Sequence, residues 1–256
     1  MHNIQIRTIF ILKKSKFMEE NDEIDVIIIS YAQTEELKAV TLNCINSLVA
    51  SEDPAKIKFN ILVIESEKSI IPYQYPYSKT IYPDVSFSYN KYLNIGIKMT
   101  SARYVCACNN DLIFHPNWAT ELLKPMKQFV DLYSASPICP VHHKKMGYKL
   151  DEGIVRGYRI RFEVSGWCIL MKRSMFKITG MLDSNYLFWF SDNDYVNTLF
   201  ALKLYHVLVT TSVVEHLESK TLNEQTKERE DELTDKEITY YKKKWDVRLG
   251  TGWSLA

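Results

Sequence analysis

The regular structure of this chain begins at residues 25–30, Asp-Val-Ile-Ile-Ile-Ser, whose four central residues form an uninterrupted run of β-branched side chains. Such a run is typical of a strand that is buried on both faces of a parallel sheet. Residues 34–49 then carry apolar side chains on one helical face, and Thr34 is placed to cap that helix. A second buried-strand pattern follows at residues 59–64. This β-α-β order predicts a right-handed crossover and an α/β fold with a mainly parallel sheet.

The rest of the chain continues as a mixture of strand and helix patterns. A third buried strand is predicted at 104–108, helices at 90–98 and 118–129, and a further helix at 188–204. The second half looks more mixed, with strand patterns at 134–138, 159–162, 168–172 and 207–211. Because no Pro-, Gly- or Ser-rich linker interrupts it, we expect one central domain. This domain is predicted at residues 24–220 and divides into halves at 24–112 and 113–220. It is preceded by an extension at 1–23 and followed by a charged helical tail at 221–256.

Composition narrows the classes of protein that the chain can represent. It has 256 residues, of which 46% are hydrophobic and 25% charged, as in ordinary globular proteins. With 32 basic and 31 acidic side chains, its overall field attracts neither nucleic acid nor an anionic membrane. No apolar run reaches the roughly 20 residues of a membrane-spanning helix. We expect a cytoplasmic protein, and a peripheral membrane association is left open.

The five cysteines are odd in number, and the spacing of Cys106 and Cys108 is not that of a zinc knuckle. Several of the five lie inside apolar runs. They are interpreted as small buried hydrophobic residues in a reducing compartment.

Three residues are candidates for chemistry. Asp111 follows a buried strand, and ligands of open α/β sheets bind beyond the carboxyl ends of strands. A carboxylate there can hold a divalent cation, although an Asp in this position also caps helices and turns. Asp192 lies in an aromatic cluster where burial can raise its pKa toward that of a general base, although an acidic first helical turn also complements the helix dipole. His216 follows a strand and is either a metal ligand or a structural histidine.

Motifs of several common enzyme classes are missing. The sequence contains no G-x-x-x-x-G-K-[ST], no G-x-G-x-x-G and no G-x-S-x-G. A P-loop enzyme, a common dinucleotide dehydrogenase and an α/β-hydrolase are therefore disfavoured.

In their order along the chain, these features resemble the family 2-like glycosyltransferases of the GT-A fold. The first strand and helix are similar to the first β-α unit of that family, and Glu65 stands where its second strand ends in an acidic residue. The family's D-x-D metal motif corresponds here to residues 109–111, Asn-Asn-Asp, with Pro116 and Trp118 following. The resemblance covers residues 24–220.

The second half of the chain carries the remaining motifs of the resemblance. Gly166 and Trp167 precede a strand like the one that lines the family's sugar site. Residues 191–194, Ser-Asp-Asn-Asp, stand where the family has Glu-Asp-x-Asp. His216 resembles a late metal-binding histidine, and residues 244–245, Lys-Trp, resemble a C-terminal signature of related bacterial members.

The resemblance implies a set of site residues. Asp192 would be the catalytic base, and Asp111 with His216 would hold Mn²⁺ or Mg²⁺. The nucleotide-sugar would be bound by Ser30, Tyr31, Glu65, Asn90, Asn94, Asn109, Asn110, Gly166, Trp167 and Lys220.

The implied function is that of an inverting, metal-dependent glycosyltransferase. The donor would be a nucleotide-diphosphate sugar, a UDP-sugar in first place, and the acceptor a glycan or another hydroxyl-bearing molecule. A nucleic-acid acceptor is disfavoured by the near-neutral charge. Two alternatives stay open. One is an inactive GT-A-fold binding protein, suggested by Ser191 and Glu65. The other is a sugar nucleotidyltransferase, although residues 30–34 lack the glycine-rich basic loop of that class.

Overall fold

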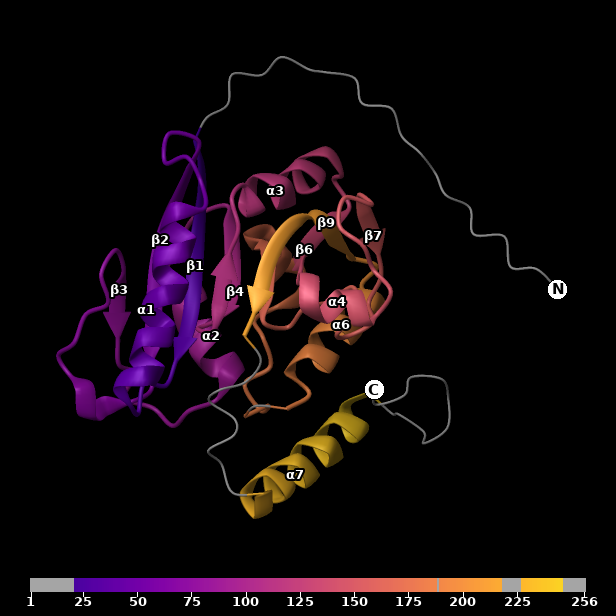
Figure 1. The fold of residues 1–256 in the computed structure, drawn as a ribbon. Helices are drawn as coiled ribbons and strands as arrows, with labels where there is room; N and C mark the ends of the chain where they lie inside the picture. The colour runs from indigo at the N-terminus through magenta and orange to yellow at the C-terminus, as the bar shows by residue number, and fades with distance from the viewer. Residues whose placement is uncertain (1–20, 188, 218–226, 246–256) are drawn as a thin grey trace.

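In the computed structural model, residues 21–187, 189–217 and 227–245 are described, and they form a sheet with helices on both faces (Figure 1). The strands are β1 (Asp22–Ser30), β2 (Ile57–Glu65), β3 (Lys79–Ile81), β4 (Tyr104–Asn109), β5 (Leu112–Phe114), β6 (Leu132–Ile138), β7 (Ile154–Arg156), β8 (Cys168–Lys172) and β9 (Tyr205–His216). The α-helices are α1 (Glu35–Ala50), α2 (Tyr89–Met99), α3 (Trp118–Gln128), α4 (Pro140–Lys145), α5 (Phe176–Thr179), α6 (Ser191–Ala201) and α7 (Lys227–Trp245). Two 3₁₀ turns lie at Lys68–Ile70 and Arg173–Met175.

The first half of the chain forms a parallel sheet, as its sequence pattern predicts. Strand β1 pairs in parallel with β2 on one side and β4 on the other, and β3 continues the order beyond β2. Side chains of β1 alternate between two apolar clusters, Val26 and Ile28 in one and Ile27 and Ile29 in the other. Both faces of the strand are therefore buried, which explains its continuous β-branched run.

The second half is mixed, as expected. Strand β8 is inserted antiparallel between β4 and β6, and β9 runs parallel to β6 but antiparallel to β5 and β7. The full strand order is β3-β2-β1-β4-β8-β6-β9-β5, with β7 paired to β9. The antiparallel insertion brings the carboxyl end of β4 to the amino end of β8.

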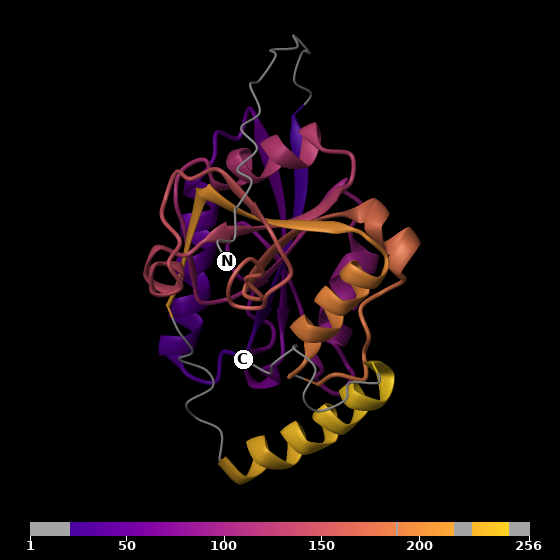
Figure 2. The ribbon, with the colours of Figure 1, turned by 90° about the vertical axis from the view of Figure 1, so that its right-hand side faces the viewer.

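Helices cover the two faces of this sheet. Side chains of α1 and α3 belong to one apolar cluster, and those of α2 and α6 belong to the other. Figure 2 shows α1 and α6 on opposite sides of the strands, with α7 lying below them. No helix among the described residues is both long and apolar enough to cross a membrane.

The helix and strands predicted in the first half of the chain are confirmed. Helix α1 begins after Thr34, whose Oγ1 accepts a hydrogen bond from the Leu37 amide at 3.2 Å. Its buried face contains Leu37, Thr41, Ile45 and Leu48, as the helical spacing indicates. The predicted strands match β1, β2 and β4, with up to three more residues at either end.

The prediction of a strand at residues 159–162 is wrong. The chain turns there, because Arg161 adopts φ 66 and the amides of Phe162 and Val164 both donate to the carbonyl of Arg159. The actual strand of this region is β7, only three residues long. A strand of that length carries too few alternating side chains to be predicted from its pattern, and the same holds for β3 and β5.

Candidate active site

Several of the predicted site residues converge where the carboxyl end of β4 meets the amino end of β8. Cys108 of β4 is paired with Cys168 of β8, and the Asn109 amide donates to the Trp167 carbonyl at 2.9 Å. The segment at 109–111 therefore lies beside Gly166 and Trp167, although more than 50 residues separate the two in sequence.

Asp111 and His216 are brought together by a second strand pair. Leu112 of β5 is paired with His216, the last residue of β9, and the Leu217 amide donates to the Asp111 carbonyl at 3.0 Å. The distance from Asp111 Oδ1 to His216 Nε2 is 3.3 Å, and both side chains are largely buried. The two residues predicted as metal ligands are thus neighbours in the fold.

The Asp111 carboxylate has an unsatisfied oxygen. Oδ1 is buried and makes no hydrogen bond, because the approach of His216 Nε2 has the distance of a bond but not its directional geometry. A buried carboxylate oxygen without a partner is costly. A divalent cation between this oxygen and the imidazole nitrogen would remove that cost with ligand types that such ions accept. The two residues therefore fit a divalent metal ion.

Trp167 holds the His216 ring in place. The two rings are parallel within 3°, with centroids 4.9 Å apart, and His142 meets the same indole edge-on at 4.9 Å. Trp167 is only 8% exposed, and its Nε1 is buried without a hydrogen-bond partner. The contacts of Trp167 thus include a parallel stack on the candidate metal ligand His216.

Asp192 lies directly against Gly166. Asp192 is in the first turn of α6, and a Cβ atom added to Gly166 would be 2.0 Å from Asp192 Oδ2. Any other residue at position 166 would therefore displace the carboxylate. Burial raises the pKa of the Asp192 carboxyl to about 6, and the charge of Arg161 opposes that rise only in part. A pKa in this range suits a general base that works near neutral pH.

Tyr89 joins the site and was not predicted from the sequence. Its hydroxyl donates to Asn109 Oδ1 at 3.2 Å. Burial is the main cause that raises its pKa, followed by the negative charge of Asp192. Tyr89 is the first residue of α2, one position before the Asn90 motif, and nothing but that position could have drawn attention to it.

A chain of buried polar groups lies at the same end of the sheet. Asn110 Nδ2 donates to Thr41 Oγ1 at 2.9 Å, and Thr41 Oγ1 is 2.9 Å from Ser30 Oγ. Ser30 Oγ in turn lies 3.5 Å from the Tyr75 hydroxyl. The predicted residues Ser30 and Asn110 are therefore linked through helix α1.

Glu65 ends this chain of polar groups and is fully buried. Its Oε1 accepts from the amides of Ala32 and Glu67, at 3.1 and 2.7 Å, and its Oε2 accepts from Tyr75 at 3.2 Å. The carboxylate thereby connects the loops that follow β1 and β2. Its predicted contact with a nucleotide base stays a prediction.

The hydrogen bonds of the other predicted nucleotide ligands lead to other parts of the chain. Asn90 and Asn94 bind the loop at 182–184, through bonds of 2.9 Å to the Asp183 carbonyl and 2.7 Å to the Leu182 carbonyl. Tyr31 is exposed and accepts from Gln33. Lys220 lies outside the described residues.

Helix α7 is attached to α6 through Asp194. Asp194 Oδ1 accepts from Lys244 Nζ at 2.7 Å and from Trp245 Nε1 at 2.9 Å. Lys244 also pairs with Asp183 at 2.7 Å. Lys244 and Trp245 are recognisable in the sequence as a signature, but no local pattern identifies Asp194 as the partner of both.

A cavity of about 70 Å³ lies beside this attachment, lined by Asn90, Asp183, Asp194 and Lys244 among others. Ligand sites for molecules of nucleotide size are several hundred Å³. The cavity is therefore too small for a molecule of that size.

Comparison with known proteins supports the fold. No protein-family profile and no curated protein sequence matches the chain. Among solved structures, the crystal structure of GalNAc-T7 with UDP, GalNAc and Mn²⁺ is similar with a TM-score of 0.61 and 13% identity. The match covers 75% of this chain and 42% of that chain, so the present protein spans less than half of it. The chain has the GT-A glycosyltransferase fold.

Proposed function

We propose that the protein is a glycosyltransferase that moves a sugar from a nucleotide-diphosphate donor to an acceptor hydroxyl. The observation that carries this proposal is the placement of Asp192 against Gly166, next to the strand junction that also holds Asp111 and His216. The segment Gly166–Trp167 thus lies next to the candidate metal ligands Asp111 and His216 and to the Asp192 carboxylate, whose pKa is raised.

Asp111 and His216 would bind Mn²⁺ or Mg²⁺ in the active enzyme. The ion would supply positive charge for the diphosphate of the donor. The unsatisfied Oδ1 of Asp111 and the fixed ring of His216 support this assignment. A related support is that the similar GalNAc-T7 structure contains Mn²⁺ with UDP.

Asp192 would act as the general base of an inverting reaction, as in the family 2-like enzymes that the sequence resembles. Its carboxylate takes the proton of the acceptor hydroxyl while the oxygen forms a bond to the anomeric carbon. The bond from that carbon to the diphosphate breaks on the opposite face, and the nucleoside diphosphate leaves with the bonding electrons. Trp167 keeps His216 in position, and Gly166 leaves space for Asp192.

The donor is proposed to be a UDP-sugar and the acceptor a glycan or another hydroxyl-bearing molecule. UDP and GalNAc are bound in the similar structure, which supports a nucleotide-sugar donor here. Ser30, Asn109 and Asn110 lie at the strand ends where the nucleotide of such a donor would bind.

The first experiment is a thermal-shift series with UDP, GDP, dTDP and CMP, each with and without Mn²⁺. A ligand that binds the folded state raises its melting temperature. We expect a Mn²⁺-dependent rise with UDP that Asp111→Asn abolishes. The matched control is Asp53→Asn, an exposed acidic residue at the start of the loop before β2. Absence of a rise with every nucleotide would contradict the proposal.

Product stereochemistry tests the inverting mechanism. Proton NMR of the transferred sugar distinguishes an inverted from a retained anomeric centre. Retention of the anomeric configuration would overturn the role of Asp192 as base, but it would not contradict the proposed donor site.

A GT-A-fold binding protein without activity is the second candidate. It is favoured by the full burial of Glu65 and by Ser191, which stands where the resembling family has Glu. If the wild-type protein binds UDP but transfers no sugar from a UDP-sugar to any acceptor hydroxyl, this second candidate replaces the first.

A further inference from the structure

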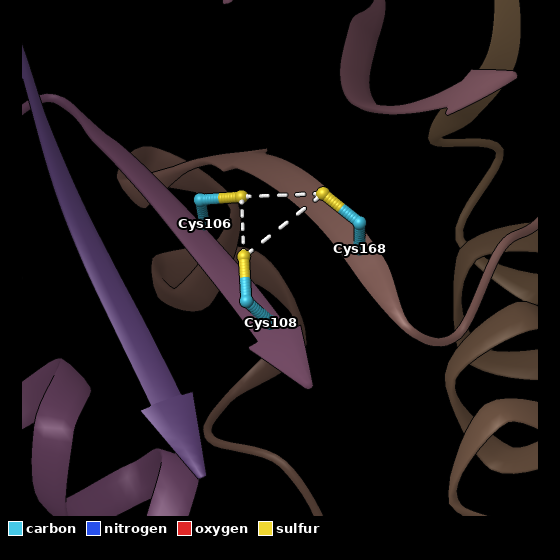
Figure 3. A group of neighbouring side chains, drawn as sticks. All are labelled: Cys106, Cys108 and Cys168. Atoms are coloured by element: carbon cyan, nitrogen blue, oxygen red, sulfur yellow. Dashed lines mark hydrogen bonds between the residues drawn. The ribbon is translucent and has the colours of Figure 1, made fainter. Parts of the chain in front are cut away.

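Three of the five cysteines converge in the core directly beneath the candidate active site. Cys106 and Cys108 point to the same face of β4, and Cys168 of β8 faces them (Figure 3). The Sγ–Sγ distances are 3.3 Å between Cys106 and Cys108, 3.8 Å between Cys106 and Cys168, and 3.9 Å between Cys108 and Cys168. All three are reduced and have no exposed surface.

We propose that Cys106, Cys108 and Cys168 form a three-coordinate binding site for a soft, thiophilic metal ion, with Cu(I) as the fitting physiological example. The proposal concerns a site separate from the one assigned to Asp111 and His216. It does not depend on the proposed transferase function.

The sulfur triangle has the dimensions of a metal site. With metal–sulfur bonds of about 2.3 Å, sulfur ligands of one ion lie about 3.8 to 4.0 Å apart. Two sides of the triangle already have this length, and the third must widen by roughly 0.5 Å. Rotation of one thiol about its Cα–Cβ bond supplies a change of that size without a backbone movement.

The ligand set selects a soft ion. All three donors are sulfur, which favours Cu(I) and zinc over hard cations such as Mg²⁺ or Mn²⁺. Structural zinc takes four ligands in a tetrahedron. Within the part of the chain that the structure describes, the group of potential ligands consists of these three cysteines, with no fourth His, Cys, Asp or Glu. Three sulfur ligands without a fourth donor suit Cu(I) better than zinc.

The position of the triangle connects it to the active site. Cys108 immediately precedes Asn109, and Cys168 immediately follows Trp167. An ion that joins β4 to β8 through these sulfurs would stiffen the junction that positions the segments at 109–111 and 166–167. Because the sulfurs are fully buried, the ion would enter as the chain folds.

The test uses the full-length chain, produced in copper-supplemented cells and purified anaerobically in the presence of a Cu(I) chelator. We expect one equivalent of retained copper and a higher melting temperature than that of the copper-free protein. Each of Cys106→Ala, Cys108→Ala and Cys168→Ala should lower the Cu(I) affinity by roughly 100-fold or more, since a ligand is lost. Cys139→Ala, a buried cysteine outside the triangle, should retain the ion and is the matched control.

A second measurement needs no variant and so does not depend on how the substitutions fold. Copper X-ray absorption of the wild-type complex should show three sulfur neighbours and no nitrogen. Nitrogen neighbours would place the ion on surface histidines and overturn the proposal, as would the absence of bound copper. If Zn²⁺ is retained in a parallel preparation and Cu(I) is not, the three-coordinate assignment is wrong.

Discussion

Asp192 and Gly166 are in such close contact that the space of a Cβ atom at position 166 is occupied by the Asp192 carboxylate, with 2.0 Å to Oδ2. This contact joins the first turn of α6 to the segment before β8. The position of the proposed base is therefore determined by the absence of a side chain at position 166.

Substitution of Gly166 should reduce activity through Asp192. Gly166→Ala forces the carboxylate to move, because a contact of that length cannot be accommodated. Misplacement of a reacting group by about 1 Å can cost about 100-fold in rate. We expect a loss in kcat of that order with little change in the Mn²⁺-dependent melting shift by UDP. A rate within twofold of wild type would contradict the arrangement. Gly147→Ala is the control for backbone strain, because its φ of 86° disfavours alanine while no atom lies near the added Cβ and Asp192 is not displaced.

The pH dependence should report on Asp192. Its pKa is about 6, so kcat/KM should rise about tenfold per pH unit below that value and level off above it. Asp192→Asn should abolish both the activity and this profile. A profile that continues to rise well above pH 7 would assign the base to another group.

Stability should respond to pH in the opposite direction. In the unfolded chain the pKa of an Asp is about 3.9, and in the folded protein that of Asp192 is about 6. Between these values the folded state binds more protons than the unfolded state, so the contribution of this group to stability falls as pH rises from about 4 to about 6. Chemical denaturation of wild type and Asp192→Asn over this range isolates the contribution, and the stability of wild type relative to the variant should fall as pH rises.

Metal binding should depend on the pair formed by Asp111 and His216. Asp111→Asn removes a ligand and also the charge on an unsatisfied buried oxygen, so the metal-free protein should be no less stable than wild type. His216→Ala should weaken Mn²⁺ binding and also leave one face of Trp167 uncovered. Titration of Mn²⁺ by paramagnetic resonance measures both affinities. Equal affinity in wild type and the two variants would remove the metal site from this position.

The attachment of α7 should contribute to stability. Lys244→Ala leaves the Asp183 and Asp194 carboxylates without their shared cation, and the expected cost is about 1–3 kcal/mol because both are partly buried. Burial acts to raise the pKa of Asp183 and to lower that of Lys244, but their hydrogen bonds outweigh it. On balance the pKa of Asp183 is lowered and that of Lys244 is raised, which agrees with a stable ion pair. Lys243→Ala, at an exposed neighbour, is the control. If Lys244→Ala and Lys243→Ala have the same denaturation midpoint, the attachment of α7 contributes nothing to stability.

Substitution of Glu65 should distinguish between two possible roles of this residue. If it contacts the nucleotide base, Glu65→Gln should change UDP affinity while stability is nearly kept. If it acts only through the loops that it binds, the same variant should lose about 1–3 kcal/mol of stability, because an amide group would face the amides of Ala32 and Glu67. Calorimetry with UDP and denaturation of the same sample separate the two outcomes. The structure favours the second.

The sequence by itself was sufficient for the first β-α-β unit. Its strands are buried on both faces, so their β-branched runs are continuous, and α1 has a capping residue and an apolar stripe. These are local patterns whose repeat is set by the backbone geometry of a helix or a strand. They can be recognised without knowing which other elements pack against them. Asp111, Asp192 and His216 also stand beside recognisable elements in the sequence, and their roles as metal ligands and base stay predictions.

Tertiary structure decided which of these residues act together. The stack of Trp167 on His216, the contact of Asp192 with Gly166 and the bonds of Asp194 to Lys244 and Trp245 join segments about 26 to 51 residues apart. The sulfur triangle likewise depends on the antiparallel insertion of β8 beside β4. The spacing of apolar residues along the sequence does not predict such pairings, because they follow from the order of the strands in the sheet. That order depends on burying both faces of the sheet together.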